Sequence, residues 1–168
     1  MGRVTCDVRR FPTVSAVDAQ TTRWVEQIRA DFGEGCFACG RENPQGLHLD
    51  QWDLADGEVS AVFEPREHHI GAGDTLHGGL AATVLDEALV WAGIMVEKVL
   101  TVTGTLDLRF RRPLYVADTI TAVGRVDERR GRRVVLSGRL ETERGTAVEA
   151  QGLYVVSREF EGPAPSTP

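Results

Sequence analysis

The residues with the types and spacing to do chemistry lie together in one segment, Asp74 to Lys98. His77, Gly78 and Gly79 stand near its beginning, and Asp86 follows eight positions after Gly78. Backbone N–H groups at the N-terminus of a helix stabilise negative charge, and glycine lets another molecule approach that backbone closely. A carboxylate within an apolar helix is costly to bury unless it is paired or used. The segment therefore offers an anion-stabilising helix end and an acid that could accept a proton.

The segment around these residues predicts one long buried helix. Apolar residues recur at helical spacing on one face, and others make the remaining faces apolar as well. These apolar positions are Ala81, Val84, Leu85, Ala88, Leu89, Trp91, Ala92, Ile94, Met95 and Val96. Asp86 and Glu87 interrupt the apolar run, so we do not expect the helix to span a membrane. Glu87 lies about 100° further round the helix than Asp86 and is the alternative candidate acid.

Length and composition predict a single soluble globular domain. The chain has 168 residues, of which 42% are hydrophobic and 26% charged, and its net charge of −6 argues against nucleic-acid binding. Three cysteines, an odd number, fit a reducing compartment better than a disulfide framework, and no apolar run follows Met1. We therefore expect a cytoplasmic protein that binds neither nucleic acid nor membrane.

Strands joined by tight turns are predicted around the central helix. We expect an amphipathic helix over residues 15–32 and strands over residues 47–52, 58–64, 101–112, 119–127, 134–141 and 147–157. An antiparallel meander with one central helix belongs to the α+β class. One curled sheet cannot cover every side of a helix that is apolar all round, so we expect a second copy of the chain to cover the rest. The amphipathic helix could pack on its own domain or on that partner.

The strand predicted over residues 101–112 alternates between two kinds of side chain. One predicted face holds Val102, Gly104, Leu106, Leu108 and Phe110, and the other holds Thr103, Thr105, Asp107, Arg109 and Arg111.

Cys36 and Cys39 form a lone CxxC within a segment rich in turn residues, 35–49. A zinc site needs two further ligands, and Cys6 and His48 are the only loose candidates nearby. The pattern therefore favours two small apolar residues in a tight turn. We expect no metal and no cofactor, and activity that survives chelation.

The stretch HGGLAATVLDEA, with CFACGRENPQGLHL before it and LTVTGTLDLRFRRPL after it, resembles the hotdog-fold acyl-CoA thioesterases. The most similar branch is the phenylacetate-pathway and THEM type. The resemblance covers residues 35–157 and implies a hotdog domain, in which a curled antiparallel sheet wraps around a long central helix. Residues 1–34 would then be an N-terminal extension with an extra short helix, and residues 158–168 a disordered tail.

The resemblance also implies an activity and roles for individual residues. Members hydrolyse thioesters of coenzyme A or of acyl-carrier protein, without metal, as homodimers or dimers of dimers. Gly78, with Gly79 second, would donate its N–H to the oxyanion of the tetrahedral centre. Asp86 would act as general base on water or as direct nucleophile, and Thr103 would hold the water. His77 would orient the loop. An ordinary tight turn, a structural acid and a plain strand threonine are the alternatives for these residues.

Arginines are frequent for an acidic protein, and some could bind the phosphates of coenzyme A, because guanidinium suits phosphate. Arg111, Arg112 and Arg130 are the candidates, although solvated turns and strand edges explain any one of them equally well. Two other functions stay open. A hotdog dehydratase would need a histidine within the helix, and a non-catalytic binder of acyl thioesters would lack the acid or the glycine.

The spacing of the two candidate groups predicts active sites shared between chains. Gly78 and Asp86 lie about 12 Å apart along one helix, whereas reacting atoms stand about 3–3.5 Å apart. Two antiparallel copies of the helix can bring the groups together. We therefore expect Gly78 from one protomer to meet Asp86 and Thr103 of its partner in a homo-oligomer.

Overall fold

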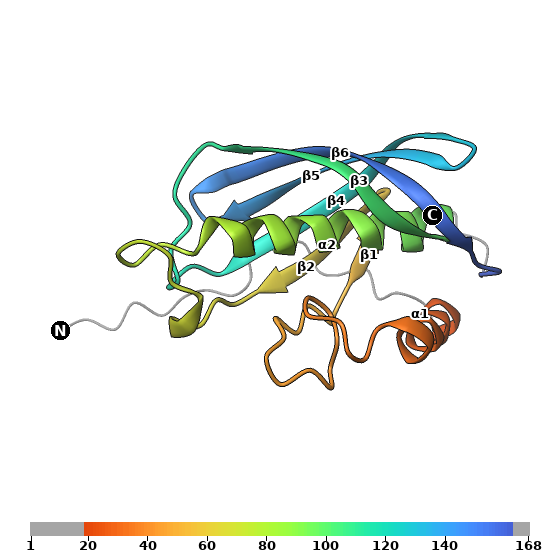
Figure 1. Ribbon diagram of the computed structural model, residues 1–168, viewed down its shortest axis with the longest axis horizontal. Helices are drawn as coiled ribbons and strands as arrows, with labels where there is room; N and C mark the ends of the chain where they lie inside the picture. Colours follow the sequence, from red (N-terminus) through yellow and green to blue (C-terminus); the bar gives the residue numbers. More distant parts are fainter. Residues whose placement is uncertain (1–18, 163–168) are drawn as a thin grey trace.

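The computed structural model describes residues 19–162, and its strands form one curled antiparallel sheet around a central helix (Figure 1). The helices are α1 (Ala19–Phe32), the short η2 (Glu67–His69) and α2 (Gly78–Glu97). The strands are β1 (Asp53–Ala55), β2 (Glu58–Phe63), β3 (Val99–Phe110), β4 (Ile120–Arg130), β5 (Arg133–Thr142) and β6 (Gly145–Glu159), in the sheet order β1-β2-β4-β5-β6-β3. The predicted α+β class and architecture, with an extra N-terminal helix, are confirmed.

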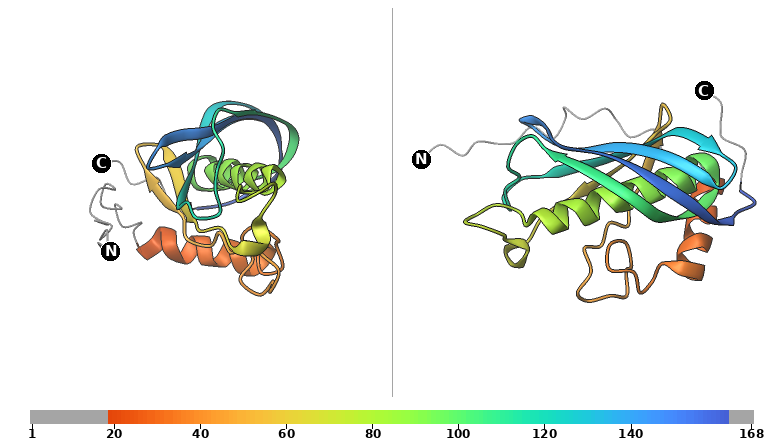
Figure 2. Two further views of the ribbon diagram at one scale, coloured as in Figure 1. Left: turned by 90° about the vertical axis from the view of Figure 1, so that its left-hand side faces the viewer. Right: turned by 45° about the horizontal axis from the view of Figure 1, so that its top comes forward.

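The central helix α2 has a defined cap at each end. His77 caps its N-terminus, and Lys98 ends it in the left-handed conformation, at φ 59°. The helix was predicted to open at His77-Gly78-Gly79, and it does; residues 74–76 precede the cap and pair with other loops. By length and composition alone α2 could cross a membrane. Here its apolar faces form the core, and the sheet curves around it, as the view along its axis shows (Figure 2, left).

The side of α2 that the sheet leaves open is covered in part by the chain's own N-terminal segment. Leu47, Leu49 and Trp52 are buried there, and the Trp52 ring stacks on Trp91 of α2 with centroids 5.7 Å apart. The strand predicted over residues 47–52 is wrong. His48 has a φ of 56°, which breaks the extended run, and the backbone of this segment bonds to the Cys36–Cys39 turn rather than to a strand.

Helix α1 packs on its own domain, near the C-terminal end of α2. This is one of the two positions predicted for it, the other being on a partner subunit. Ile28 is buried, and the Trp24 ring meets Phe160 edge-on at 6.3 Å. The indole of Trp24 also donates to the carbonyl oxygen of Glu161 at 3.1 Å. Residues 158–162 are therefore held against α1. The predicted helix start at residues 15–18 and the rest of the predicted tail, residues 163–168, lie outside the described residues.

Strand β3 does not keep one face from end to end. Its register against β6 shifts between Thr103 and Thr105, which marks a β-bulge. Before the bulge Thr101 is buried and Val102 is 60% exposed, whereas after it Leu106 packs on the core. The prediction that Val102 shares a face with the apolar residues after the bulge is therefore wrong. The bulge turns Thr103 toward α2.

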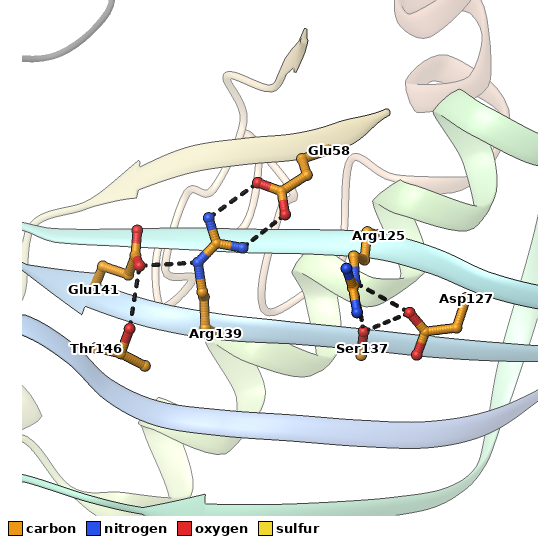
Figure 3. Close-up of polar contacts among 7 residues, drawn as sticks. All are labelled: Glu58, Arg125, Asp127, Ser137, Arg139, Glu141 and Thr146. Atoms are coloured by element: carbon orange, nitrogen blue, oxygen red, sulfur yellow. Dashed lines mark hydrogen bonds and ion pairs between the residues drawn. The ribbon is translucent and has the colours of Figure 1, made fainter. Parts of the chain in front are cut away.

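The outer face of the sheet carries paired charges (Figure 3). The Arg139 guanidinium donates to both carboxylate oxygens of Glu58, at 2.8 and 3.0 Å, and to Glu141 at 2.9 Å. Arg125 makes an ion pair with Asp127 at 3.1 Å. The Arg139–Glu58 pair joins β5 to β2 across β4 on the face away from α2, and the other two pairs lie within single strands.

Candidate functional site

Asp86, on α2, is held by side chains from two neighbouring strands. The Tyr154 hydroxyl donates to its Oδ1 at 2.6 Å, and the Thr103 hydroxyl donates to the same atom at 2.9 Å. Thr103 and Tyr154 are paired in the β3–β6 register, so the sheet presents them side by side beneath the helix. Two fixed donors therefore orient this carboxylate.

The sequence analysis missed Tyr154. A signal existed, because Val148, Ala150, Gly152, Tyr154 and Val156 alternate along the last strand as inward positions. A tyrosine at such a position needs a hydrogen-bond partner for its hydroxyl, and a half-buried acid on the facing helix can supply one.

The Tyr154 phenol is held in its protonated form beside Asp86 and acts as a hydrogen-bond donor to it. Burial raises the pKa of Tyr154, and its hydrogen bond to Asp86 raises it further, so the phenol stays protonated and donates. Both donors use Oδ1, and no hydrogen bond to Oδ2 is made within residues 19–162. The second carboxylate oxygen is therefore available to a water molecule.

The N-terminus of α2 presents one free backbone donor. His77 Nδ1 accepts the N–H of Gly79 at 3.0 Å, and its carbonyl oxygen accepts those of Leu80 and Ala81. The Gly78 N–H has no partner among the described residues, and Gly78 is exposed. The Gly79 N–H is thus already hydrogen-bonded, and the Gly78 N–H remains free to bind an incoming anion.

A pocket of about 340 Å³ opens beside Gly78. Its walls are Thr75, Leu76, Gly78, Ala81, Phe110, Arg111, Arg112, Pro113 and Leu114. Arg111 pairs with Glu149 at 2.9 Å, and Arg112 donates to the carbonyl oxygen of Arg144. Arg130, at the end of β4, lies at the opposite end of the sheet and pairs with Glu128 (Figure 1). Two of the three predicted arginines therefore lie at this pocket.

Within one chain the two parts of the predicted site stay separate. Asp86 is not among the residues that line the pocket beside Gly78. The two residues are eight positions apart on α2, which corresponds to about 12 Å along its axis. The structure brings Thr103 and Tyr154 to Asp86, and Arg111 and Arg112 to Gly78.

Glu87, the alternative acid, lies in a second polar cluster with Cys36 and Cys39. Its carboxylate accepts the Trp91 indole N–H at 2.9 Å, and burial raises its pKa to about 7. Hydrogen bonds from the Cys39 thiol and from backbone N–H groups lower the pKa of Cys36 to about 5, whereas the same thiol contact and burial raise that of Cys39. The three ligand atoms lie within 4.8 Å of one another.

The sequence analysis expected no further metal ligands beside Cys36 and Cys39. It did not predict that Glu87 would lie next to them. Glu87 follows the CxxC by about fifty positions, and no spacing rule joins a turn to a helix so far along the chain. His48 is not part of the cluster, and Cys6 lies outside the described residues.

Comparison with known proteins finds similarity over the central part of the chain. Residues 73–149 match the family model described as the thioesterase superfamily. A protein of Candida albicans described as "uncharacterized protein, mitochondrial" is 31% identical over 91 residues, which are 54% of this chain and 41% of that protein. MIOREX complex component 3 of Saccharomyces cerevisiae is 32% identical over 95 residues, 53% of this chain and 33% of its own length. The chain thus spans less than half of the curated relatives it matches.

The predicted cytoplasmic location is wrong on this comparison, because the curated relatives are mitochondrial. The prediction was drawn from an odd number of cysteines and from the lack of an apolar run after Met1. These features distinguish secreted from intracellular proteins and do not distinguish one intracellular compartment from another.

Solved structures confirm the hotdog fold. A thioesterase superfamily protein superposes with a TM-score of 0.67 at 22% identity, over 83% of this chain and 80% of that one. The E. coli PaaI protein of the phenylacetic acid degradation operon gives 0.57 at 18%, over 61% and 78%. A Streptococcus mutans protein bound to acetyl-CoA gives 0.60 at 16%, over 67% and 94%. At these identities the likeness concerns the fold alone.

Proposed function

We propose, on the match of residues 73–149 to the thioesterase superfamily model, that the protein hydrolyses acyl thioesters to a free acid and a thiol. The observation that carries the proposal is the Asp86 carboxylate. Tyr154 and Thr103 both donate to its Oδ1, and its other oxygen has no partner among the described residues. An acid held in this way is suited to activate a water molecule.

Asp86 acts in this proposal as a general base. Its Oδ2 takes a proton from water while the water oxygen attacks the thioester carbonyl carbon. The carbon–sulfur bond of the resulting tetrahedral centre then breaks, and the protonated Asp86 returns the proton to the departing thiolate. Thr103 and Tyr154 hold the carboxylate in place throughout, which limits the cost of reorganisation.

The oxyanion of the tetrahedral centre binds at Gly78. Its N–H has no intrachain partner among the described residues, it stands at the positive end of the α2 dipole, and it borders the 340 Å³ pocket. Gly79 is not the donor in this scheme, because its N–H is bonded to His77 Nδ1. His77 acts as a cap, and this contact also argues against the dehydratase alternative, which needs a histidine free to transfer protons.

Each site takes Gly78 from one protomer and Asp86 from its partner. The separation of about 12 Å along α2 is too large for one chain to place both groups at one carbonyl. Strand β3 lies at an edge of the sheet, and Val102 on it is 60% exposed. A long edge strand with exposed apolar side chains is a template for pairing with a second copy. We propose a homodimer, or a dimer of dimers, on this basis.

Coenzyme A thioesters are the proposed substrates, with acyl-carrier thioesters as the related class. Arg111 and Arg112 border the pocket beside Gly78 and offer cationic groups to phosphate. A protein of the same fold has been solved with acetyl-CoA bound, and another comes from a phenylacetic acid degradation operon; we extend a ligand of this kind to the present chain as part of the proposal. Arg130 lies at the other end of the sheet, so it cannot bind phosphate at this pocket within the same chain.

The test is a panel of acyl-CoA thioesters with detection of the released thiol. We expect turnover by the intact protein and a loss of about 10²–10⁴-fold in kcat for Asp86→Asn. Asp107→Asn, which changes an exposed aspartate on β3, is the matched control and should keep full activity. If Asp86→Asn stays active and Glu87→Gln does not, the wrong carboxylate has been chosen. If no thioester is hydrolysed but acyl-CoA binds, the protein is a binder rather than an enzyme.

A further inference from the structure

The tight turn at Cys36–Cys39 is built to present two sulfur atoms in one direction. The Gly40 N–H donates to the Cys36 carbonyl oxygen at 3.0 Å, which closes the turn. A side chain at Gly40 would bring its Cβ to 2.5 Å from the carbonyl oxygens of Cys36 and Glu34, so only glycine fits. The thiolate is the form of cysteine that binds metal.

The central helix supplies a third ligand from the opposite side. The Glu87 carboxylate oxygen and the two sulfur atoms lie within 4.8 Å of one another. Zinc bonds sulfur at about 2.3 Å and carboxylate oxygen at about 2.0–2.2 Å, so ligand atoms around one tetrahedral ion lie about 3.5–3.8 Å apart. Small side-chain rotations would therefore close the cluster on a single ion.

The surroundings of the cluster suit an ion with several anionic ligands. The Trp91 indole donates to Glu87 Oε1 at 2.9 Å and fixes the carboxylate, as outer-shell donors do at metal sites. The Arg29 guanidinium lies over the Trp91 ring, 4.9 Å from its centroid. Arg29 is buried, and its Nε and Nη1 have no hydrogen-bond partner among the described residues. A cation in this position would balance the negative charge of two thiolates and a carboxylate around a divalent ion.

We propose that Cys36, Cys39 and Glu87 bind one zinc ion, with a water molecule in the fourth position. Binding replaces the two thiol protons, which leave to solvent. Two sulfur ligands select zinc over the hard cations magnesium and calcium. The ion would tie the segment before β1 to the turn of α2 that also carries Asp86. This inference does not rest on the proposed hydrolase activity.

Metal content of the whole chain is the direct test. The protein is expressed with added zinc, purified under thiol reductant without chelator, and analysed by plasma mass spectrometry. We expect about one zinc per chain, with loss of zinc in Cys36→Ser, Cys39→Ser and Glu87→Gln. Cobalt added to the metal-free protein should give a thiolate-to-cobalt charge-transfer band. Trp91→Phe, which keeps the ring but removes the N–H, should weaken zinc binding about 10–100-fold.

Two matched controls should keep the metal: Cys6→Ser, which removes the third cysteine, and Glu97→Gln, which changes another glutamate of α2. A chelator should lower the melting temperature of the intact protein and leave that of Glu87→Gln unchanged. Glu87→Gln is nearly isosteric and decides the matter if a cysteine variant does not fold. A reduced protein that binds no zinc, or a Cys36–Cys39 disulfide in protein prepared anaerobically, would overturn the proposal. Equal zinc loss in Cys6→Ser would overturn the ligand set.

Discussion

The Tyr154 hydroxyl donates to Asp86 Oδ1 at 2.6 Å, across 68 positions of sequence, from the last strand to the central helix. This contact sets the acid's orientation and takes up the hydroxyl of a fully buried phenol. A hydrogen bond to a charged group contributes about 1.5–3 kcal/mol. The Tyr154–Asp86 hydrogen bond therefore contributes to the stability of the fold and also orients the proposed catalytic acid.

Tyr154→Phe should reduce kcat about 10–100-fold while the fold persists, because the phenyl ring fills the same space and only the donor is lost. Thr103→Val should have a similar but separate effect, since it removes the second donor to Oδ1. Steady-state kinetics with an acyl-CoA substrate measures both. Tyr115→Phe changes the chain's other tyrosine and is the control. Unchanged kinetics in both variants would show that Asp86 needs neither donor.

Gly104 makes the β-bulge that turns Thr103 inward. A Cβ at this position would lie 2.9 Å from the Leu153 carbonyl oxygen, closer than real contacts allow. Gly104→Ala should therefore lower the free energy of unfolding by about 1–3 kcal/mol and disturb the contact between Thr103 and Asp86. Urea unfolding checks the first effect and kcat the second. Gly35→Ala, where a Cβ meets nothing within 4 Å, should change neither. Equal stability of both variants would mean that β6 can shift away from the added Cβ without loss of stability.

Sequence periodicity was sufficient to predict the central helix and most strands. It was insufficient to predict the β-bulge in β3. The apolar pattern of α2 and the alternation of β4, β5 and β6 follow from which side chains must leave water, and the structure has these elements within a few residues of their predicted positions. The alternation predicted for β3 failed at Gly104, because a bulge adds one residue without changing composition. The left-handed His48 broke the strand predicted over residues 47–52 for a similar local reason.

The candidate site was predictable where its residues are neighbours in sequence. His77, Gly78 and Asp86 share one helix, so spacing alone related them. Tyr154 and Glu87 acquire their partners only through strand register and loop packing, which the sequence order does not contain. Long-range pairing therefore accounts for the missed Tyr154 and for the missed contact between Glu87, already named as the alternative acid, and the CxxC.

His69 should make stability depend on pH. Its ring is buried and stacked on Phe63, and Nδ1 accepts the Arg66 N–H at 2.9 Å. Burial, with His68 and Arg66 nearby, lowers its pKa below the ordinary 6.5, so the folded protein holds the neutral form. The unfolded chain takes up the proton first as pH falls. The stabilisation is therefore complete above the unfolded pKa and is lost as pH falls through it toward the folded pKa.

His69→Asn tests this dependence, because the amide oxygen can still accept from Arg66 but does not titrate. Urea unfolding between about pH 5 and about pH 8 should show a smaller loss of stability at the acidic end than in the intact protein. His68→Asn, at the exposed neighbour, should leave the pH dependence nearly as it was. An identical acid sensitivity in His69→Asn and the intact protein would assign the effect to other groups.

Two inactive variants should restore activity to one another if the sites are shared. Asp86→Asn removes the base, and Gly78→Val blocks approach to the Gly78 N–H. A Cβ at Gly78 would meet only Phe110, at 3.7 and 3.8 Å, which is ordinary contact, so the second variant should fold. In a hybrid dimer one site carries both lesions and the other carries neither. Random mixing makes half of the dimers hybrid, so roughly a quarter of the intact activity should return.

The activity expected from the mixture is different if each chain forms a complete active site by itself. Every site in the mixture would then contain one lesion, and no activity would return however completely the chains exchange. Mixing by co-expression or refolding, with native mass spectrometry to count hybrid dimers, separates the two cases. Hybrids that form and remain inactive would refute the shared site while leaving Asp86 as the acid. A return of activity in proportion to the hybrid fraction requires Gly78 and Asp86 to work across the interface, because the helix spacing of about 12 Å keeps them apart within one chain.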